Sequence, residues 1–324
     1  MKNPFIIAEI AQGFEGSKKL VELYLKAFVY SGADAIKFQI FYADELALPD
    51  YAYYSLFKSL ELSFDIWKNA VKEVHKKGRE FYSDIYGIDS LKKLELCGLD
   101  GYKIHSTDIN NIYLLKYVAK TRKKVFLSTG GSDLKEIETA LSIFDKCDVT
   151  LMVGFQAEPT EISENNLNRI NILKNLFKKP VGFQDHTAGD SILQAYPSFV
   201  AMGLGACCIE KHLTLSRAAR VEDYVSALIP EEFQQWVYAV KEVYKSLGKK
   251  EWKLTRRENE YKAKVKRAVC SIKDIKKGDI ITQNSVTLKR ANDKDAIFSL
   301  SNVIGKKTLR HISRNSSIKT NDLK

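Results

Sequence analysis

The sequence predicts a closed (β/α)₈ barrel, also called a TIM barrel, followed by a small and mostly β C-terminal domain. Residues 5–247 alternate eight short apolar segments with longer amphipathic helical segments. Parallel strands need a crossover between them, so eight such repeats fit a closed parallel barrel better than an open sheet. After residue 268 the pattern changes to short alternating pieces separated by turn residues, which is typical of a small β domain.

The expected strands are short apolar runs, and the expected helices follow them. The strands cover residues 5–10, 35–39, 80–83, 101–104, 124–128, 150–153, 180–184 and 206–211. Helical periodicity covers residues 18–29, 64–76, 90–97, 112–119, 134–144, 166–177 and 230–247.

An open doubly wound sheet is the structural alternative. Such a sheet usually carries a G-x-G-x-x-G turn after its first strand. Residues 11–16 read AQGFEG and do not match that turn. We therefore expect the barrel over residues 1–247, a charged and exposed linker over residues 248–267, and the C-terminal domain over residues 268–324.

Composition narrows the classes of function. The chain has 324 residues, of which 45% are hydrophobic, and a formal net charge of +11. Its lysines are scattered in pairs and form no basic stripe interleaved with aromatic residues, so we expect anionic small substrates and no nucleic acid. The sequence has no apolar run of about 18 residues and no signal-peptide pattern at its start, so we expect no membrane span and a cytoplasmic location.

Polar side chains stand at the end of nearly every expected strand. In a (β/α)₈ barrel the active site lies at the carboxyl ends of the strands, so these side chains would share one rim. One polar strand end is uninformative, but their convergence indicates a binding or catalytic site. The rim residues are Glu9, Glu15, Lys37, Gln39, Asp84, Lys103, residues 105–108, residues 128–131, Gln156, Asp185, His186, Glu210 and His212.

His186 and His212 end adjacent expected strands and could reach one point near the barrel axis. Neutral imidazoles suit a transition metal such as Mn²⁺, and two protein ligands leave positions open for water and substrate. Asp185 and Glu210 would then act as outer partners of the imidazoles. Taken alone, each histidine is equally typical of a hydrogen-bonded structural residue.

Lys37 and Lys103 end the second and fourth strands. A lysine that points into a barrel is costly unless an anion faces it. The two lysines could hold a phosphate or carboxylate group, form a Schiff base with a carbonyl substrate, or make structural ion pairs. Ser128 and the glycine-containing turn after it offer hydroxyl and backbone N–H groups that suit a phosphate or a carboxylate.

The order of these motifs resembles the sialic acid synthase family, which includes N-acetylneuraminate synthases and the bacterial synthases of legionaminic and pseudaminic acids. The resemblance covers nearly the whole chain. In the C-terminal region, residues 275–279 and 288–290 resemble the family's antifreeze-like (SAF) domain. In the barrel it rests on residues 7–10 (IAEI), 15–17 (EGS), 31–39 (SGADAIKFQ), 102–104 (YKI), 127–130 (LSTG), 185–187 (DHT) and 209–214 (IEKHLT).

The resemblance implies a synthase that joins phosphoenolpyruvate to an open-chain N-acetylmannosamine-like hexose and releases phosphate. It implies a divalent metal, Mn²⁺ in the first place and otherwise Mg²⁺ or Co²⁺, held by the catalytic residues His186 and His212. It also implies a homodimer in which the SAF domain of one chain covers the barrel mouth of the other.

The resemblance assigns further roles by position. Glu15 would handle protons in catalysis. Gln156 is a further expected substrate-binding residue, and Arg290 would reach the substrate from the SAF domain of the other chain. Phosphoenolpyruvate would be held by Lys37, Lys103, Ser106 and Ser128, and the sugar would be surrounded by Gln39, Asp108 and Asp223.

The sequence also departs from the family pattern. Gly13-Phe14 replaces the usual Asn-His, Asp84 replaces a threonine near phosphoenolpyruvate, His105 replaces a glycine, and residues 153–156 replace His-Cys-Thr-Asn. A carboxylate beside a substrate anion needs compensation, which His105 could supply. These changes favour an altered sugar. Two alternatives stay open, a non-catalytic or sugar-phosphate-binding relative and a Schiff-base aldolase that uses Lys37 or Lys103.

Overall fold

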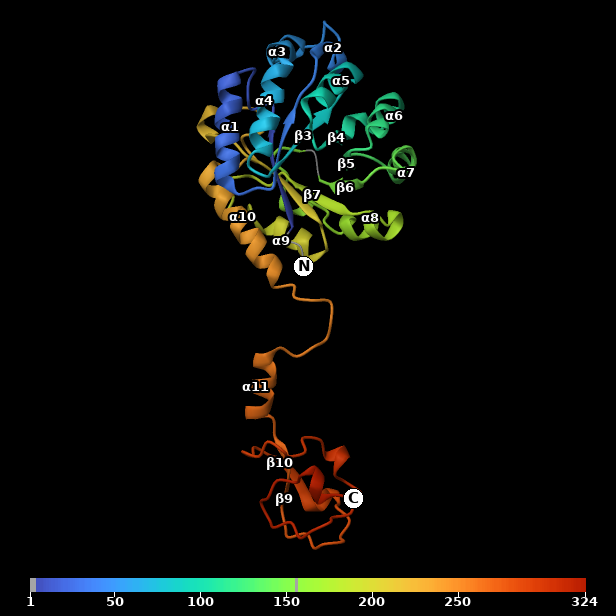
Figure 1. Ribbon diagram of the computed structural model, residues 1–324, viewed down its shortest axis with the longest axis vertical. Coiled ribbons are helices and arrows are strands. Elements are labelled where there is room, and N and C mark those ends of the chain that lie inside the picture. Colours follow the sequence, from blue (N-terminus) through green and yellow to red (C-terminus); the bar gives the residue numbers. More distant parts are fainter. Residues whose placement is uncertain (1–3, 155–156) are drawn as a thin grey trace. The chain divides into compact units, whose positions relative to one another are not determined.

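The computed structural model describes residues 4–154 and 157–324. The chain divides into two compact units, residues 1–248 and 249–324 (Figure 1). Each unit packs around a hydrophobic core of its own.

The first unit is a closed barrel of eight parallel strands. Each strand pairs with the next along the chain, and β8 pairs with β1 to close the barrel. This confirms the (β/α)₈ prediction, and the strand bounds agree with the expected ones to within two residues. The strands are β1 (Phe5–Ala11), β2 (Ala35–Gln39), β3 (Glu80–Ile85), β4 (Gly101–Ile104), β5 (Lys124–Ser128), β6 (Val149–Val153), β7 (Val181–Asp185) and β8 (Cys208–His212).

Helices surround the barrel (Figure 1). All seven expected helices are present. Three helices of this unit were not predicted by periodicity. Two have only four and six residues, too short to display a clear 3.6-residue repeat, and the third, residues 196–203, is apolar at most of its positions and shows no polar face. The helices of this unit are α1 (Lys18–Ser31), α2 (Ala43–Leu46), α3 (Tyr54–Ser59), α4 (Phe64–His75), α5 (Ile88–Cys97), α6 (Ile112–Thr121), α7 (Leu134–Ile143), α8 (Arg169–Phe177), α9 (Tyr196–Gly203) and α10 (Pro230–Lys245).

Local capping signals mark the ends of some of these helices. Ser17 Oγ accepts a hydrogen bond from the backbone N of Leu20 at the start of α1. Asp133 and Glu136 form a reciprocal capping box at the start of α7. At the end of α1, Gly32 adopts a left-handed φ of 75°, which glycine tolerates without a steric penalty. The chain can therefore leave the helix and turn into β2.

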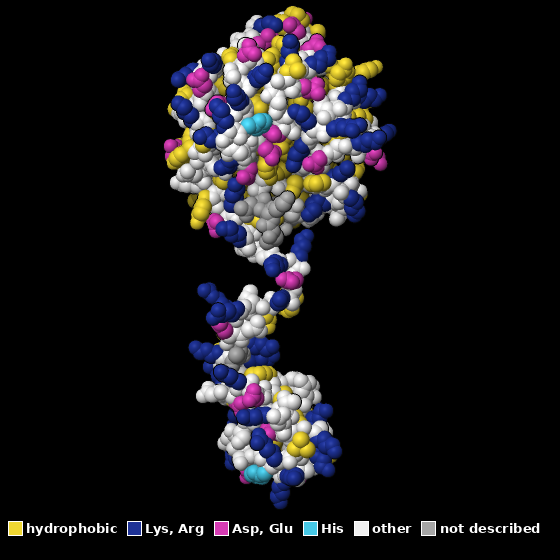
Figure 2. Space-filling model, viewed as in Figure 1, with side chains coloured by type: hydrophobic (Ala, Val, Ile, Leu, Met, Phe, Trp, Pro, Cys, Tyr) yellow, Lys and Arg dark blue, Asp and Glu magenta, His cyan; other side chains and the backbone are white. Residues whose placement is uncertain are grey.

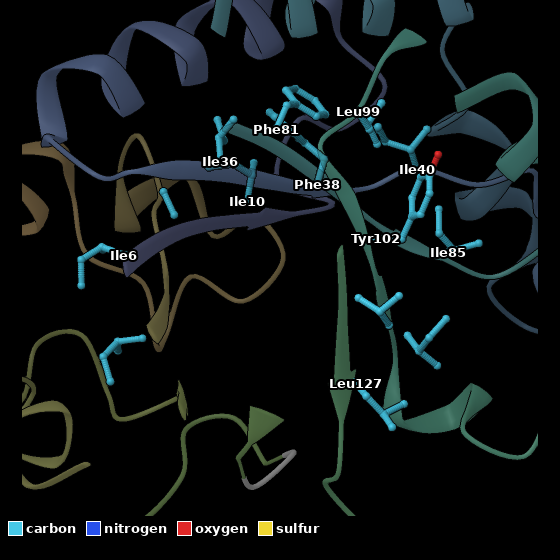
Figure 3. Packing of buried hydrophobic residues seen from close by; sticks show 14 of the residues in the cluster. Ile6, Ile10, Ile36, Phe38, Ile40, Phe81, Ile85, Leu99, Tyr102 and Leu127 are labelled. Carbon is cyan, nitrogen blue, oxygen red and sulfur yellow. The ribbon is translucent and has the colours of Figure 1, made fainter. Parts of the chain in front are cut away.

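Along each strand the side chains alternate between the helix layer and the barrel interior. The outward face packs against the helices in one large apolar cluster, which includes Ile6, Ile36, Phe38, Phe81 and Leu127 (Figure 3). Burying a side chain of this size contributes roughly 1.5–3 kcal/mol. Because this outer core supports the fold, the inward face is free to carry polar residues.

The inward face is apolar at one level of the barrel. There, Gly101 and Gly182 make room for large neighbours, because a Cβ on Gly182 would lie 2.7 Å from Met152 Sδ and one on Gly101 2.8 Å from Tyr82 Cε1. Two residues further along the strands the same face becomes polar and charged, which provides the floor of the site. The apolar cluster is Ile7, Ala35, Tyr82, Phe126, Met152 and Cys208, and the polar residues above it are Glu9, Lys37, Asp84, Lys103, Ser128 and Glu210.

The second unit contains helix α11 (Arg256–Val265), which lies within the segment expected to be a charged connection. A capping box between Thr255 and Glu258 starts this helix, although the segment has little apolar surface. After it, β9 (Ala268–Ser271) pairs antiparallel with β10 (Val286–Lys289). The core of this unit comprises Val269, Ile275, Ile281, Val286, Val303, Ile312 and Ile318.

The surface charge is mixed in sign. Figure 2 shows Lys and Arg side chains interspersed with Asp and Glu over the visible face of the first unit. Within residues 4–154 and 157–324, no helix is long and apolar enough to cross a membrane.

Candidate active site

A cavity of about 320 Å³ lies at the carboxyl ends of the barrel strands. Its floor is the charged layer, and its walls come from strand ends and the loops after them. The lining residues are Glu9, Gln12, Lys37, Gln39, Leu46, Phe57, Tyr86, Lys103, His105, Thr107, Glu158, Gln184, His186, Glu210, His212, Glu222 and Asp223.

His186 and His212 lie side by side in this cavity. His212 ends β8 and His186 directly follows β7, and their ring centroids are 5.2 Å apart. Burial, with a smaller contribution from Lys103, lowers the pKa of His186 to about 4. Burial and the neighbouring His186 hold the pKa of His212 well below its usual value. Both imidazoles are therefore neutral at physiological pH, which is the form that binds metals.

Glu158 faces both imidazoles. Its Oε1 lies 3.6 Å from Nε2 of His186 and 3.6 Å from Nε2 of His212. The three residues bring one ligand atom each to within 4.8 Å of one another. In the part of the chain that the structure describes, no other group of three or more His, Cys, Asp or Glu side chains does so.

Asp223 lies beside this group. Its Oδ2 is 3.6 Å from Nδ1 of His212, and its side chain shares a hydrogen bond with Glu158. Burial and the charge of Glu158 raise the pKa of Asp223 to about 9, and burial also raises the pKa of Glu158. One proton shared between the two carboxyl groups allows them to lie together. At neutral pH Asp223 therefore holds a proton that it can share with Glu158.

Lys37 is enclosed by carboxyl groups on the cavity floor. Its Nζ donates a hydrogen bond to Asp84, contacts the carboxyl group of Glu9, and lies 3.8 Å from Oε2 of Glu210. Burial lowers the pKa of Lys37, but the charges of Asp84, Glu210 and Glu9 outweigh it and raise the pKa well above its usual value. The Lys37 amine is thus firmly protonated.

Lys103 approaches the same carboxylates from β4. Its Nζ lies 2.5 Å from Oε1 of Glu210 and 4.0 Å from Oδ1 of Asp84. Burial raises the pKa of Asp84, but Lys37 and Lys103 outweigh it and bring the pKa below its usual value, with a smaller contribution from His105. The expected compensation for Asp84 therefore comes mainly from the two lysines.

The two lysines of this floor are paired with acidic side chains. Burial raises the pKa of Glu9 to about 8, so Glu9 holds a proton at neutral pH. Asp84 and Glu210 are the other acidic partners, and each has an oxygen within 4.0 Å of the Nζ of both Lys37 and Lys103. A substrate anion would consequently meet lysines that are already paired.

A second buried ion pair joins the strands that carry the histidines. Lys211 Nζ lies 3.1 Å from Oδ1 of Asp185 and donates to the backbone O of Thr187 at 2.8 Å. Asp185 also accepts hydrogen bonds from the Thr187 backbone N and from Ser198 Oγ on α9. Asp185 and Glu210, expected as outer partners of the imidazoles, thus bond to Lys211 and Lys103. Glu158 and Asp223 are the carboxylates that face the rings.

Six of the sequence-predicted site residues line the cavity. They are Lys37, Gln39, Lys103, His186, His212 and Asp223. Their roles with substrate remain predictions.

The other predicted residues lie elsewhere or outside the described residues. Glu15 is exposed in the turn after β1 and does not line the cavity. Ser106 and Asp108 lie in a half-buried 3₁₀ turn, also outside the lining. Gln156 lies outside the described residues, and Arg290 belongs to the second unit, where it lines a separate cleft of about 750 Å³.

Ser128 is fully buried at the end of β5. Its Oγ has no hydrogen-bond partner among the described residues. A buried hydroxyl without a partner is costly. This favours the predicted role of Ser128 in binding a polar ligand group, although its side chain does not line the cavity.

Sequence reasoning did not assign a binding role to several lining residues. Glu9 was expected on the rim without a binding role, and the inward-facing Gln184 could have been found by continuing the two-residue alternation of its strand past the apolar layer. Glu158 follows β6 in a loop, and no periodic signal places a loop residue. Its position became evident only from the structure.

Comparison with known proteins assigns the family. Residues 24–252 match the NeuB family, and residues 266–324 match the SAF domain. The chain belongs to the NeuB family. This confirms the sialic acid synthase resemblance and the SAF domain at its C-terminal end.

Two relatives of this NeuB-family protein align with most of its sequence. An uncharacterized protein of Methanocaldococcus jannaschii is 35% identical, covering 88% of this chain and 84% of the relative. The N,N'-diacetyllegionaminic acid synthase of Campylobacter jejuni is 31% identical, covering 94% and 96%. The crystal structure of the N-acetylneuraminic acid (sialic acid) synthetase of Leptospira borgpetersenii in complex with citrate superposes with a TM-score of 0.75 at 29% identity, covering 80% of this chain and 90% of that one.

Proposed function

We propose that the protein is a nonulosonic acid synthase, a transferase that condenses phosphoenolpyruvate with an open-chain N-acetylmannosamine-like hexose. The main support is one cavity in which neutral His186 and His212 lie beside the protonated Lys37 and the buried Lys103. Membership of a family with legionaminic, pseudaminic and sialic acid synthases supports the same reaction.

The proposed reaction forms a carbon–carbon bond and releases phosphate by cleavage of a carbon–oxygen bond. C3 of phosphoenolpyruvate bonds to the sugar aldehyde carbon, and the aldehyde oxygen gains a proton. Water adds at C2, and the bond between C2 and the phosphate oxygen then breaks. The products are a 2-keto acid and inorganic phosphate.

The residues of the cavity suit these steps. Lys37 and Lys103 would hold the carboxylate and phosphate groups, with Ser106 and Ser128 as further predicted contacts. Gln39 and Asp223 line the cavity, where they could bond sugar hydroxyls. Glu9 and the Glu158–Asp223 pair hold protons inside the cavity at neutral pH. They are therefore better situated for proton transfer than the exposed Glu15.

The donor set fits a divalent cation. Two neutral imidazoles and a carboxylate are nitrogen and oxygen ligands that Mn²⁺ accepts, with Mg²⁺ or Co²⁺ as alternatives. Such a cation would act as a Lewis acid on the sugar aldehyde.

A homodimer forms part of this proposal. The family resemblance implies that the SAF domain of one chain covers the barrel mouth of the other chain. Arg290 would then reach the substrate bound in the barrel of that other chain. A cytoplasmic location, where phosphoenolpyruvate would be supplied, remains a prediction.

The charges around the two lysines favour one alternative function and argue against the other. Both lysines are already neutralised by Asp84 and Glu210, which favours the alternative of a relative that binds a sugar without turnover. A Schiff-base aldolase needs an unprotonated amine. The raised pKa of Lys37 argues against that role for this residue.

One experiment separates these functions. The protein is incubated with phosphoenolpyruvate and a panel of mannosamine-type and 2,4-diacetamido hexoses, with Mn²⁺ or with EDTA, and phosphate release is measured. We expect release with at least one sugar, and only with the metal. Absence of release with every sugar would contradict the proposal, as would EDTA-resistant activity trapped by borohydride.

A further inference from the structure

The loop that carries Glu158 is held in place by two hydrogen bonds from Thr160. Thr160, two residues later, donates its backbone N–H to the backbone O of His186 at 2.9 Å. Thr160 Oγ1 donates to the backbone O of Ala157 at 2.9 Å. The loop that carries Glu158 is thus bonded directly to the residue that its carboxylate faces.

The carboxylate itself is oriented by a neighbour. Its hydrogen bond with Asp223 holds it on the cavity side, and Asp223 also lies beside His212. The Glu158 side chain is 25% exposed, whereas those of His186 and His212 are 9% and 8% exposed. A cation entering from the cavity would therefore meet Glu158 at the rim and the imidazoles beneath it.

The distances suit a shared cation better than direct hydrogen bonds. Oε1 of Glu158 is 3.6 Å from each Nε2, beyond hydrogen-bond range. Ligand atoms about 2.0–2.2 Å from one metal ion lie roughly 2.8–3.1 Å from each other in octahedral geometry and roughly 3.3–3.6 Å in tetrahedral geometry. One ion between the three atoms would need only small side-chain shifts, and it would stabilise a carboxylate that otherwise faces two neutral rings.

We propose that Glu158 is a third protein ligand, so that this chain binds its divalent metal with two histidines and one carboxylate. This inference takes its cavity from the proposed function and adds a ligand to the expected two-histidine site. Around a six-coordinate ion such as Mn²⁺, three positions then remain for water and substrate. The third ligand would tighten metal binding in the absence of substrate.

The test measures metal binding without turnover. Mn²⁺ is titrated calorimetrically into the full-length protein, the variant E158Q and the variant E222Q. Glu222 lines the same cavity and does not belong to the three-residue group, so E222Q removes an equal charge as a matched control. We expect E158Q to weaken Mn²⁺ binding at least tenfold and E222Q to change it less than threefold.

A second readout counts the water on the metal. Water-proton relaxation of the Mn²⁺ complex should report one more exchangeable water in E158Q than in the unchanged protein or in E222Q. Equal Mn²⁺ affinity and an equal water count in E158Q and the unchanged protein would overturn the proposal. So would equal weakening in E158Q and E222Q, because the carboxylate would then act only through its charge.

The two proposals can fail separately. If E158Q behaves as expected but the unchanged protein releases no phosphate with any sugar, the third ligand stands and the proposed synthase does not. If phosphate release depends on Mn²⁺ and E158Q binds Mn²⁺ normally, the synthase stands and the third ligand does not. Circular dichroism and thermal melting of both variants verify that each is folded.

Discussion

At the scale of single residues, Asp84 is the carboxylate that offsets the charge of both lysines on the cavity floor. Its carboxylate bonds to Lys37 and lies 4.0 Å from Lys103, so one negative charge serves both lysines. Glu210 pairs with Lys103 in the same way. A phosphate or carboxylate that approaches the lysines must therefore compete with carboxylates that belong to the protein.

Replacing Asp84 should improve anion binding. We expect D84T to lower the Kd for phosphoenolpyruvate about tenfold, ~1.4 kcal/mol, because the variant removes a like charge near the substrate anion and leaves Lys37 less neutralised. Titration calorimetry in the presence of Mn²⁺ measures this change. E95Q, which removes a carboxylate from the barrel's outer helix α5, serves as the control. Weaker binding in D84T would show that Asp84 supports the substrate site.

The two histidines should retain their metal in mildly acidic solution. An imidazole with an ordinary pKa would be about nine-tenths protonated at pH 5.5 and would release a metal. Burial lowers the pKa of His186 to about 4 and that of His212 well below its usual value, so protons compete only as the pH falls towards 4. We expect the Kd for Mn²⁺ to change less than about threefold between pH 7 and pH 5.5. A weakening of about a hundredfold would indicate ordinary histidine pKa values.

Some site residues were predictable from the sequence and others were not. His186 and His212 end consecutive barrel strands, and strand ends of a barrel share one rim. Lys37 and Lys103 were found in the same way. Glu158 lies in a loop whose course depends on the bond from Thr160 to His186, and Glu15 lies exposed in the turn after β1, outside the cavity lining. Neither position could be derived from periodicity.

At the scale of elements, β7 and β8 are joined by the Lys211–Asp185 pair directly below the histidines. Each partner precedes one of them in sequence, since Asp185 is followed by His186 and Lys211 by His212. Ser198 bonds the same carboxylate to α9, so three elements meet at Asp185. This pair fixes the register of the two strand ends that carry the metal ligands.

Breaking this pair should destabilise the barrel. We expect K211M to lower the free energy of unfolding by about 3–5 kcal/mol, because it leaves the Asp185 charge buried and unpaired. The double variant K211M/D185N should recover part of that loss. K116M, at an exposed lysine on α6, should change stability by less than about 0.5 kcal/mol. Urea unfolding measures all three, and equal stability of K211M and K116M would refute the role of the pair.

The alternation of side chains between the two faces of each strand explains why the barrel strands were predictable. Each strand carries outward apolar residues, and the interior changes from apolar to charged after two residues, as from Ile7 to Glu9 and from Ala35 to Lys37. The short helix α9 and the helix α11 gave no such signal. α9 is apolar at most of its positions and shows no polar face, and α11 depends on its capping box in a segment without an apolar face.

At the scale of the whole molecule, the chain consists of two units, each with its own core. The sequence predicted both folds, since the barrel follows from eight strand–helix repeats and the SAF domain from its resemblance.

Mixing two inactive variants tests the proposed domain-swapped dimer. H212A should disable the barrel of its own chain, and R290A the SAF domain that covers the other chain's barrel. In a swapped heterodimer one site keeps both residues, so co-expressed H212A and R290A should recover about a quarter of the phosphate-release activity. If each SAF domain serves its own barrel, the mixture should stay as inactive as the separate variants.

Metal-dependent phosphate release by the two-histidine centre is the central claim, and it can be measured directly. Phosphate release from phosphoenolpyruvate is followed with an accepting hexose and Mn²⁺ for the unchanged protein, H186A and H212A, after circular dichroism shows that all three are folded. The account predicts that each alanine variant loses at least about a thousandfold in rate and no longer binds Mn²⁺ at micromolar concentration. Full activity in either variant, or full activity of the unchanged protein in EDTA, would contradict it.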